Sequence, residues 1–491
     1  MPPVKRTGVN SQLFRLAIGR NRQGRPLPAF KARNSGLLLV VRDDCWREVT
    51  ANGSKCFAPV GIFNRHWFPE AAALLKLLLI VPTCDGQDVG EAWVAYQWVR
   101  RLAERHDVTL ITYHKRGKLP ASAQLQGVRV VEWTEPAILG RAERLNSMLK
   151  PGYVSFYLKA RHWIRRALAK GERFDLAHQL APVAMRYPSP IAGLGIPYLI
   201  GPVGGSLDAP SGFDSESDTA PWYVGLRRLD KLRIRFDPLL RRTYEGAACV
   251  IGIAPYVGDL LEGSSIQRLE FLSETGISCM PDFVDRSTRE GPIKLLFVGR
   301  VIRTKGVRDA IRAMAQLNDL PVTFDVVGDG FDRLECERLA SEIRADGRVT
   351  FHGRKAREEV DAFYRDADIF VFPSYREAGG NAVFEAMAWG LPLIVSDRGG
   401  PGAAVDETSG IRIQPINPEH FAQEIAGAIR CLVADRALRL SLGNGARARV
   451  AKTVLWDQKV DTMGLLYRKI LDETHRTGFI VRSTESVMQR H

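Results

Sequence analysis

The chain has 491 residues and a formal net charge of +14, and 45% of its residues are hydrophobic and 25% charged. These values exclude a disordered or fibrous chain and predict a globular protein too long for one hydrophobic core, so we expect two domains. The longest apolar run, Ala71 to Val81, is short and contains Lys76, which argues against a membrane-spanning helix.

The positive charge is concentrated near the N-terminus, where residues 1–75 contain 12 Lys and Arg against 4 Asp and Glu. A basic surface can attract nucleic acid, an anionic membrane or an anionic substrate. No nucleic-acid-binding motif accompanies it, so we expect no nucleic acid partner and favour substrate or membrane. The seven cysteines are scattered and form no CxxC pair. This predicts reduced thiols in a cytoplasmic protein and no structural zinc site.

Residues 1–72 form a basic extension in which Gly and Pro interrupt any regular pattern. Only Gly36 to Val41 has the composition of a strand, and the long apolar core of a secretory signal is missing from this segment. We expect the extension to be poorly ordered, with a small folded appendage as the alternative.

From Leu75 onward, buried-strand runs alternate with helical periodicity. Leu75 to Pro82 predicts a strand, Thr83 to Gly90 a polar turn, and Glu91 to Arg105 a helix with apolar residues on one face. A second strand follows at Val108 to Tyr113. This strand–helix–strand unit is typical of an open, doubly wound parallel sheet, in which the turn after the first strand faces the ligand crevice.

The same alternation continues through the rest of the first domain. Strands are predicted at 128–132, 174–178, 197–200 and 249–253, and helices at 154–169 and 224–244. His178 stands at the carboxyl end of one of these strands, and the glycine loop Gly201 to Gly205 follows another. Open sheets bind their ligands at these ends.

The predicted helix at 224–244 is strongly basic. Its Arg and Lys residues alternate with leucine and isoleucine, a pattern that suits a helix against anionic lipid head groups or a pyrophosphate-linked acceptor. A solvated helix face is the alternative interpretation.

A second domain repeats the alternation of strands and helices seen in the first. The polar stretch Ser287 to Pro292 predicts a hinge, so we place the boundary near residue 288. A strand at Ile293 to Val298 leads into a turn that carries Arg300 and Lys305, and later strands end at Gly328 and Gly353. Two Rossmann-like sheets in one chain leave a cleft between them.

The stretch Ile369 to Val395 combines a buried strand, a turn rich in glycine and a helix that begins at Asn381. The free N–H groups of a helix start favour an anion, and Gly379 and Gly380 let a ligand approach the backbone. Glu377 in the turn and Glu385 in the helix add two carboxylates, and carboxylates accept hydrogen bonds from sugar or ribose hydroxyls. Capping of a turn and a helix by two ordinary surface acids is the alternative for the glutamates alone.

These residues carry a family resemblance. Glu377, seven intervening residues and Glu385, followed by Ala386-Met387-Ala388-Trp389-Gly390-Leu391-Pro392, resemble the E-x7-E and EAMAxGxP signature of the retaining glycosyltransferases of family 4. The turn from Gly299-Arg300 to Lys305-Gly306 resembles the family's GR…KG motif. The resemblance covers about residues 75–472.

The resemblance implies the GT-B fold, an α/β architecture of two Rossmann-like, doubly wound parallel-sheet domains that face a cleft. Residues 73–288 would form the acceptor domain and 289–455 the nucleotide-sugar donor domain. Residues 456–491 would contain a helix that crosses back to the first domain, followed by a frayed tail.

The family's activity is transfer of a sugar from a nucleotide-diphosphate donor to a hydroxyl acceptor with retention at the anomeric carbon. The resemblance implies that Arg300 and Lys305 hold the diphosphate and that Glu385 accepts from ribose hydroxyls. Glu377, with the amides of Gly380 and Asn381, would orient the donor sugar. The other glycines implied at the donor site are Gly90, Gly299, Gly328 and Gly353.

Two further roles follow from the resemblance. Gly204 and Gly205 would contact the acceptor. Many family members carry a histidine in that loop near the transferred sugar, and this chain has none, so His178 is a catalytic candidate, with a hydrogen-bonded structural histidine as the alternative. No metal and no cofactor are expected.

Departures from the family pattern leave the donor open. The turn reads Glu377-Ala378-Gly379-Gly380 where many members have E-G-F-G, and the glutamate that commonly follows Gly399-Gly400 is absent. We expect a glycan or lipid-linked acceptor in bacterial-type polysaccharide, lipopolysaccharide or glycolipid synthesis, in the cytoplasm or at the inner face of the plasma membrane. A GT-B nucleotide-sugar epimerase and a non-catalytic GT-B subunit that binds nucleotide sugar are the alternatives.

Overall fold

The structure is a computed structural model that describes residues 14–20, 26–31, 38–42, 45–50, 53–59, 74–136, 152–216 and 228–476. Its contacts divide the chain into two units. One comprises residues 1–73 with 278–281, and the other comprises 74–277 with 282–491.

The first unit contains a five-stranded antiparallel sheet in chain order. Its strands are β1 (Phe14–Arg20), β2 (Pro26–Lys31), β3 (Leu38–Arg42), β4 (Cys45–Thr50) and β5 (Gly53–Pro59). The prediction of only one strand in this segment, at Gly36 to Val41, is wrong. That strand corresponds to β3, and the other four strands were not predicted. Glycines and prolines between these short strands mask the alternation that each one carries. Whether the extension is poorly ordered stays a prediction.

The second unit begins with a seven-stranded parallel sheet in the order β12-β11-β10-β9-β6-β7-β8. Its strands are β6 (Lys76–Thr83), β7 (Asp107–His114), β8 (Arg129–Thr134), β9 (Leu176–Gln179), β10 (Tyr198–Val203), β11 (Cys249–Gly252) and β12 (Leu269–Phe271). The inner strand β6 is fully buried from Leu77 to Val81, because helices cover both faces of the sheet. Its helices include α1 (Glu91–Ala103), α2 (Ala121–Gln124), α4 (Gly152–Ala169) and α7 (Tyr256–Leu260).

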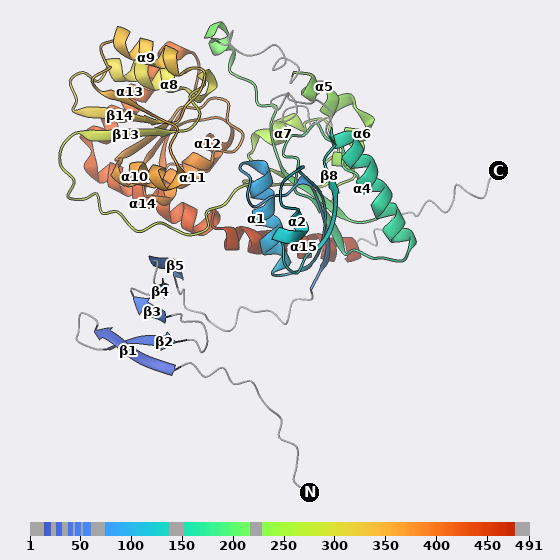
Figure 1. The fold of residues 1–491 in the computed structure, drawn as a ribbon. Helices are drawn as coiled ribbons and strands as arrows, with labels where there is room; N and C mark the ends of the chain where they lie inside the picture. The colour runs from blue at the N-terminus through green and yellow to red at the C-terminus, as the bar shows by residue number, and fades with distance from the viewer. Residues whose placement is uncertain are drawn as a thin grey trace. The chain divides into compact units, whose positions relative to one another are not determined.

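A six-stranded parallel sheet follows in the order β15-β14-β13-β16-β17-β18. Its strands are β13 (Ile293–Val298), β14 (Val322–Val327), β15 (Val349–Gly353), β16 (Ile369–Phe372), β17 (Leu393–Ser396) and β18 (Gly410–Ile413). Its helices are α8 (Val307–Ala315), α9 (Arg333–Glu342), α10 (Arg357–Asp366), α11 (Asn381–Ala388), α12 (Gly399–Ala404), α13 (Pro418–Ala434) and α14 (Arg436–Thr453). The strand order reverses direction between β13 and β16, and ligands of open sheets bind at such a switch point. Figure 1 shows this sheet and its helices in yellow to orange.

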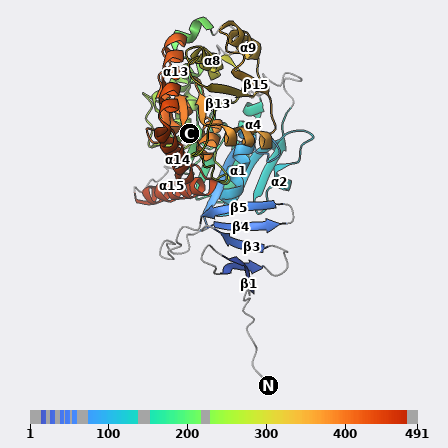
Figure 2. The same ribbon diagram turned by 90° about the vertical axis from the view of Figure 1, so that its left-hand side faces the viewer.

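The last described helix, α15 (Trp456–Arg476), packs against the first parallel-sheet domain. Its apolar residues Trp456, Val460 and Met463 share a core with α1 and β6. Trp456 meets Trp98 of α1 edge-on, with ring centroids 5.2 Å apart. Figures 1 and 2 both show α15 beside α1. The predicted tail at 477–491 lies outside the described residues.

The linker between the two parallel-sheet domains is fixed by Arg286. Its buried guanidinium donates to the carbonyl oxygens of Ala367 at 2.8 Å and of Tyr364 and Trp389 at 2.9 Å. These carbonyls lie at the ends of α10 and α11, where helices leave acceptors unpaired. Arg286 therefore fixes the linker to the C-terminal ends of α10 and α11, and α11 is the helix that follows the glycine-rich turn.

The basic helix predicted at 224–244 is two helices in the described part of the chain, α5 (Arg228–Phe236) and α6 (Pro238–Glu245). Asp237 separates them, since its carboxylate accepts from the N–H groups of Leu239 and Leu240 at the start of α6. Pro238 occupies the first position of α6, a signal that the sequence carried and the prediction of one helix missed. Residues 224–227 lie outside the described residues.

Candidate active site

Two loops meet at the switch point of the second sheet, one after β13 and one after β16. Gly306 ends the first loop with a φ of 76°, and a Cβ there would lie 2.2 Å from the carbonyl oxygen of Pro373 in the second. The Ser374 hydroxyl donates to the carbonyl of Thr304 at 3.2 Å. The two predicted motifs are thus packed directly against each other, and only glycine fits at residue 306.

Lys305 and Glu377 join the two loops through an ion pair. The ammonium of Lys305 is almost buried and also lies 5.2 Å from the centre of the Phe372 ring. Burial, together with repulsion from Arg300, lowers the pKa of Lys305 to about 7. Arg300 itself is exposed beside it. The two predicted phosphate-binding cations, Arg300 and Lys305, and the predicted sugar-binding acid, Glu377, therefore lie together where the two loops meet.

The helix start beyond Glu377 has the geometry of an anion site. Gly380 precedes α11 in a left-handed conformation, with φ 108° and ψ 56°, and no side chain caps the described first turn. The N–H groups that open α11 are thus left for a ligand, and the helix dipole favours negative charge there. Asn381, the first residue of α11, is exposed.

Gly379 makes room for a first-domain carboxylate. A Cβ at residue 379 would lie 2.1 Å from Oε1 of Glu274, so the glycine is required for this contact. The Trp98 indole N–H holds the backbone of Glu274, donating to its carbonyl at 2.7 Å. Burial raises the pKa of Glu274, and its Oε2 has no hydrogen-bond partner in the described part of the chain.

Glu385 is held from the neighbouring helix α10. The Tyr364 hydroxyl donates to its Oε2 at 3.1 Å, and the Arg357 guanidinium lies 3.7 Å from its Oε1. Burial raises the pKa of Glu385, although Arg357 and Tyr364 oppose this rise. Arg357 also lies over the ring of Trp93 in the first domain, 5.9 Å from its centre.

A pocket joins Glu385 to the first domain. It is lined by Asp88, Val89, Gly90, Trp93, Val94, Thr275, Gly276, Ile277, Arg357, Asn381 and Glu385. Gly90 precedes α1 with a φ of 66°, and a Cβ there would meet open space. Three predicted donor-site residues, Gly90, Asn381 and Glu385, therefore line one cavity.

The other predicted glycines cluster at the carboxyl ends of β13, β14 and β15. The N–H of Gly328 donates to the carbonyl of Gly353 at 2.8 Å. Gly328 has a φ of 134°, and a Cβ there would lie 1.8 Å from the carbonyl oxygen of Gly299. These close backbone approaches need glycine, so packing alone accounts for the residues, and their contact with a donor stays a prediction.

His178 is not part of the site. It is fully buried, one ring nitrogen is 2.7 Å from the Tyr467 hydroxyl of α15, and the other is 2.7 Å from the carbonyl of Gly201. Burial lowers its pKa to about 4. The catalytic prediction for His178 is therefore replaced by the structural alternative, because both nitrogens are engaged inside the protein and no substrate can reach them.

Gly204 and Gly205 are both engaged by protein. The N–H of Gly204 donates to the carbonyl of Val183 at 2.7 Å, and the N–H of Gly205 donates to the Tyr256 hydroxyl at 2.9 Å. A Cβ at Gly204 would lie 2.0 Å from Ile253. Their contact with an acceptor stays a prediction.

Sequence reasoning missed Arg357, Tyr364 and Glu274. Arg357 and Tyr364 are seven residues apart on α10 and so share one face, a spacing that could have paired them with Glu385. Glu274 follows the short edge strand β12, which has too few residues to give a pattern.

The described residues contain neither a candidate metal site nor a candidate membrane-spanning helix. No cluster of three or more His, Cys, Asp or Glu side chains there is arranged to hold a metal ion. None of the helices in that part combines the length and apolar character needed to cross a bilayer.

Two family models match the chain. The model described as "Glycosyl transferases group 1" matches residues 282–449, and the model described as "Glycosyl transferase 4-like domain" matches residues 89–271. The first spans both switch-point loops and α11. The chain belongs to glycosyltransferase family 4. The predicted family and the predicted GT-B fold are thereby confirmed.

Curated relatives of this family 4 member resemble parts of it. It is 31% identical over 248 residues to the D-inositol 3-phosphate glycosyltransferase of Corynebacterium jeikeium, covering 48% of this chain and 55% of the relative. It is 29% identical over 232 residues to the lipopolysaccharide core biosynthesis glycosyltransferase LpsE of Rhizobium meliloti, covering 46% and 65%. Both alignments span less than two thirds of the relative's length.

Solved structures resemble this family 4 member in fold. A sucrose-phosphate synthase from Thermosynechococcus elongatus aligns with a TM-score of 0.56 at 23% identity, covering 81% of this chain and 99% of that one. Anabaena HepE, solved in complex with UDP and glucose, aligns with a TM-score of 0.52 at 15% identity, covering 80% and 99%.

Proposed function

We propose that the protein is a retaining glycosyltransferase that moves a sugar from a nucleotide-diphosphate sugar to a hydroxyl acceptor. The observation that carries this proposal is the Lys305–Glu377 ion pair at the switch point, between a loop with a second cation, Arg300, and the uncapped start of α11. A diphosphate needs the cations and the helix start, and a sugar needs the carboxylate. One donor molecule carries both groups.

In the proposed mechanism, Arg300 and Lys305 neutralise the charge that develops on the departing diphosphate. The bond between the anomeric carbon and the diphosphate oxygen breaks, and the acceptor oxygen bonds to the same face of that carbon. The acceptor's proton goes to the leaving phosphate oxygen. His178 takes no part, because it lies inside the core.

Glu385 would bind the nucleoside end of the donor. Its carboxylate is oriented by Tyr364 and lies in a pocket with Asn381, so it can accept from a ribose hydroxyl there. We use UDP as the first probe, since the HepE structure was solved with UDP.

We propose that no divalent metal is required, because Arg300, Lys305 and the N-terminus of α11 supply the positive charge that a metal would otherwise provide. Unchanged transfer in the presence of a chelator supports this point. Loss of transfer that returns on adding Mg²⁺ opposes it.

For the acceptor, we propose a glycan or lipid-linked molecule in polysaccharide, lipopolysaccharide or glycolipid synthesis, met in the cytoplasm at the inner face of the membrane. The support lies on α5 and α6, where Leu232, Phe236 and Leu239 are exposed among basic residues. Exposed apolar side chains beside arginines suit a membrane containing anionic lipids. Ion pairs of Arg233 with Asp237 and Arg241 with Glu245 reduce this charge, as a solvated face would.

Product analysis tests the proposal. Purified protein is incubated with UDP-, GDP- and ADP-sugars and with lipid-linked acceptors, and the anomeric configuration of the product is determined by NMR. Transfer with retained configuration supports the proposal. Transfer with inversion refutes the mechanism, epimerised nucleotide sugar identifies an epimerase, and nucleotide-sugar binding without turnover identifies a non-catalytic subunit.

A further inference from the structure

A segment of the first parallel-sheet domain lies against the second. We call residues 207–216, which follow β10 and the loop at Gly204 and Gly205, the strap. The Arg376 side chain donates to the carbonyl of Leu207 at 2.9 Å, and Arg398 donates to the carbonyl of Asp208 at 2.9 Å. Both donors belong to loops at the carboxyl edge of the second sheet, so the strap crosses from one domain to the other.

The middle of the strap is anchored by Phe213. This side chain is fully buried, and its ring lies 4.3 Å from the ring of Tyr375 and 6.0 Å from that of Phe421. The Arg303 guanidinium covers it at 5.3 Å. Next to it, a Cβ at Gly212 would lie 2.0 Å from the carbonyl oxygen of Ile416. These contacts of Phe213 and Gly212 all come from residues of the second domain.

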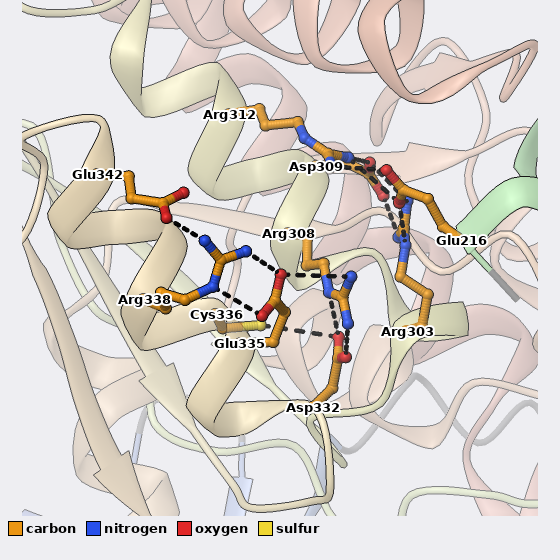
Figure 3. A network of polar contacts seen from close by, with 10 residues as sticks. All are labelled: Glu216, Arg303, Arg308, Asp309, Arg312, Asp332, Glu335, Cys336, Arg338 and Glu342. Carbon is orange, nitrogen blue, oxygen red and sulfur yellow. Dashed lines mark hydrogen bonds and ion pairs between the residues drawn. The ribbon is translucent and has the colours of Figure 1, made fainter. Parts of the chain in front are cut away.

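The strap ends in the ion-pair network of Figure 3. Glu216 accepts from Arg303 at 2.5 Å and from Arg312 of α8 at 2.6 Å. Arg303 also donates twice to the fully buried Asp309, at 2.7 and 3.0 Å. Burial alone would lower the pKa of Arg303, but Asp309 and Glu216 raise it overall. The hydrogen bond from Arg312 and the charge of Arg303 lower the pKa of Glu216 despite its burial, so both groups stay charged at neutral pH.

The strap's partners are the immediate neighbours of the candidate active-site residues. Arg303 stands between Arg300 and Lys305 in the loop after β13, and Tyr375 and Arg376 directly precede Glu377 in the loop after β16. Each of the two loops that form the Lys305–Glu377 pair is thus fixed by a first-domain contact. A charged network that is fully satisfied holds its loop in one geometry.

We propose that the strap positions the two donor loops, so that Phe213 and Glu216 are positioning residues contributed by the first domain to the diphosphate site of the second. This proposal rests on the proposed function. Small displacements of groups that bind a leaving diphosphate are costly, since stabilisation depends on donors already in place. The donor site is therefore complete only while the strap is docked.

The test compares Glu216→Gln with Asp214→Asn in the full-length protein. Glu216→Gln keeps the side-chain shape and removes the negative charge that binds Arg303 and Arg312. Asp214→Asn is the matched control, because it removes one negative charge from an exposed residue of the strap. We expect Glu216→Gln to raise the Kd for UDP about tenfold, with Asp214→Asn unchanged. Phe213→Leu, which keeps an apolar side chain in the site, should shift the Kd in the same direction.

Backbone amide exchange provides a readout independent of any ligand. Glu216→Gln should speed exchange in residues 299–306 and 373–381, and Asp214→Asn should not. Wild-type exchange in both loops together with wild-type UDP affinity overturns the strap proposal. A wild-type protein that binds no nucleotide and transfers no sugar, with faster loop exchange in Glu216→Gln, instead refutes the proposed function and leaves the loop coupling standing.

Discussion

Lys305 and Glu377 form an ion pair between the loops that follow β13 and β16. The strand order reverses between these two strands, so their carboxyl ends open a crevice for a ligand. Burying a lysine and a carboxylate together costs desolvation energy, so such a pair is unusual in a turn without a function. The pair suits a site that must bind a diphosphate beside a sugar. Predictions about donor binding follow from this pair and its surroundings.

Lys305→Ala should weaken UDP binding by about tenfold to a hundredfold, because a buried charge-assisted contact to the diphosphate is lost. Isothermal titration of UDP measures the effect. Lys452→Ala, an exposed lysine on α14, is the matched control and should bind UDP as the wild type does. Equal UDP affinities of Lys305→Ala and the wild type would show that Lys305 does not bind the donor.

UDP affinity should fall as the pH rises above 7. The pKa of Lys305 is lowered to about 7, so in the free protein the ammonium that attracts the diphosphate is lost as the pH rises through that value. Above pH 7 the Kd should increase by up to about tenfold per pH unit, with uptake of a proton on binding. In Lys305→Arg the guanidinium stays charged, so the dependence should flatten, and an unchanged slope would rule out Lys305 as its source.

Glu385→Gln should weaken UDP binding about tenfold but leave pyrophosphate binding unchanged, because the carboxylate is placed to accept from ribose. Replacing UDP with 2′-deoxy-UDP or 3′-deoxy-UDP should cost the wild type affinity and cost the variant much less. Glu358→Gln, an exposed acid on α10, controls for the loss of charge. Equal losses for UDP and pyrophosphate would place Glu385 at the phosphates instead.

His178→Asn should lower stability without a change in the pH dependence of turnover. His178 is buried with its pKa lowered to about 4, below its ordinary value of 6.5. Its contribution to stability is therefore present above pH 6.5 and is lost as the pH falls from 6.5 towards 4. Melting temperatures should show a gap between wild type and variant at pH 8 that narrows at pH 5. His162→Asn, on the exposed face of α4, should show no gap.

The second sheet and its motif loops could be predicted because their signals are local. β16 is an apolar run that is buried throughout, and β13 is apolar and buried from Leu295 to Phe297. The glycines at 306 and 380 mark positive φ angles next to these strands. The family resemblance predicted that Lys305 and Glu377 act on one donor, but it did not predict the ion pair between them.

Other features depend on contacts that a local pattern does not contain. Phe213 lies in a stretch of Gly, Ser and Asp with no periodicity, and its partners Tyr375 and Phe421 are distant in the sequence. His178 lies at the end of a strand, where a catalytic histidine could also lie. Only the packing of α15 shows that its Nδ1 is hydrogen-bonded to the Tyr467 hydroxyl. Tertiary contacts decide both cases.

Steady-state turnover of Glu377→Ala and Lys305→Ala, alone and combined, tests the central claim most directly. We predict that each single substitution lowers kcat/KM for sugar transfer by about a hundredfold or more. The double substitution should cost less than the product of the single effects, because both residues act on one donor. Turnover at the wild-type rate in either single variant would contradict the account.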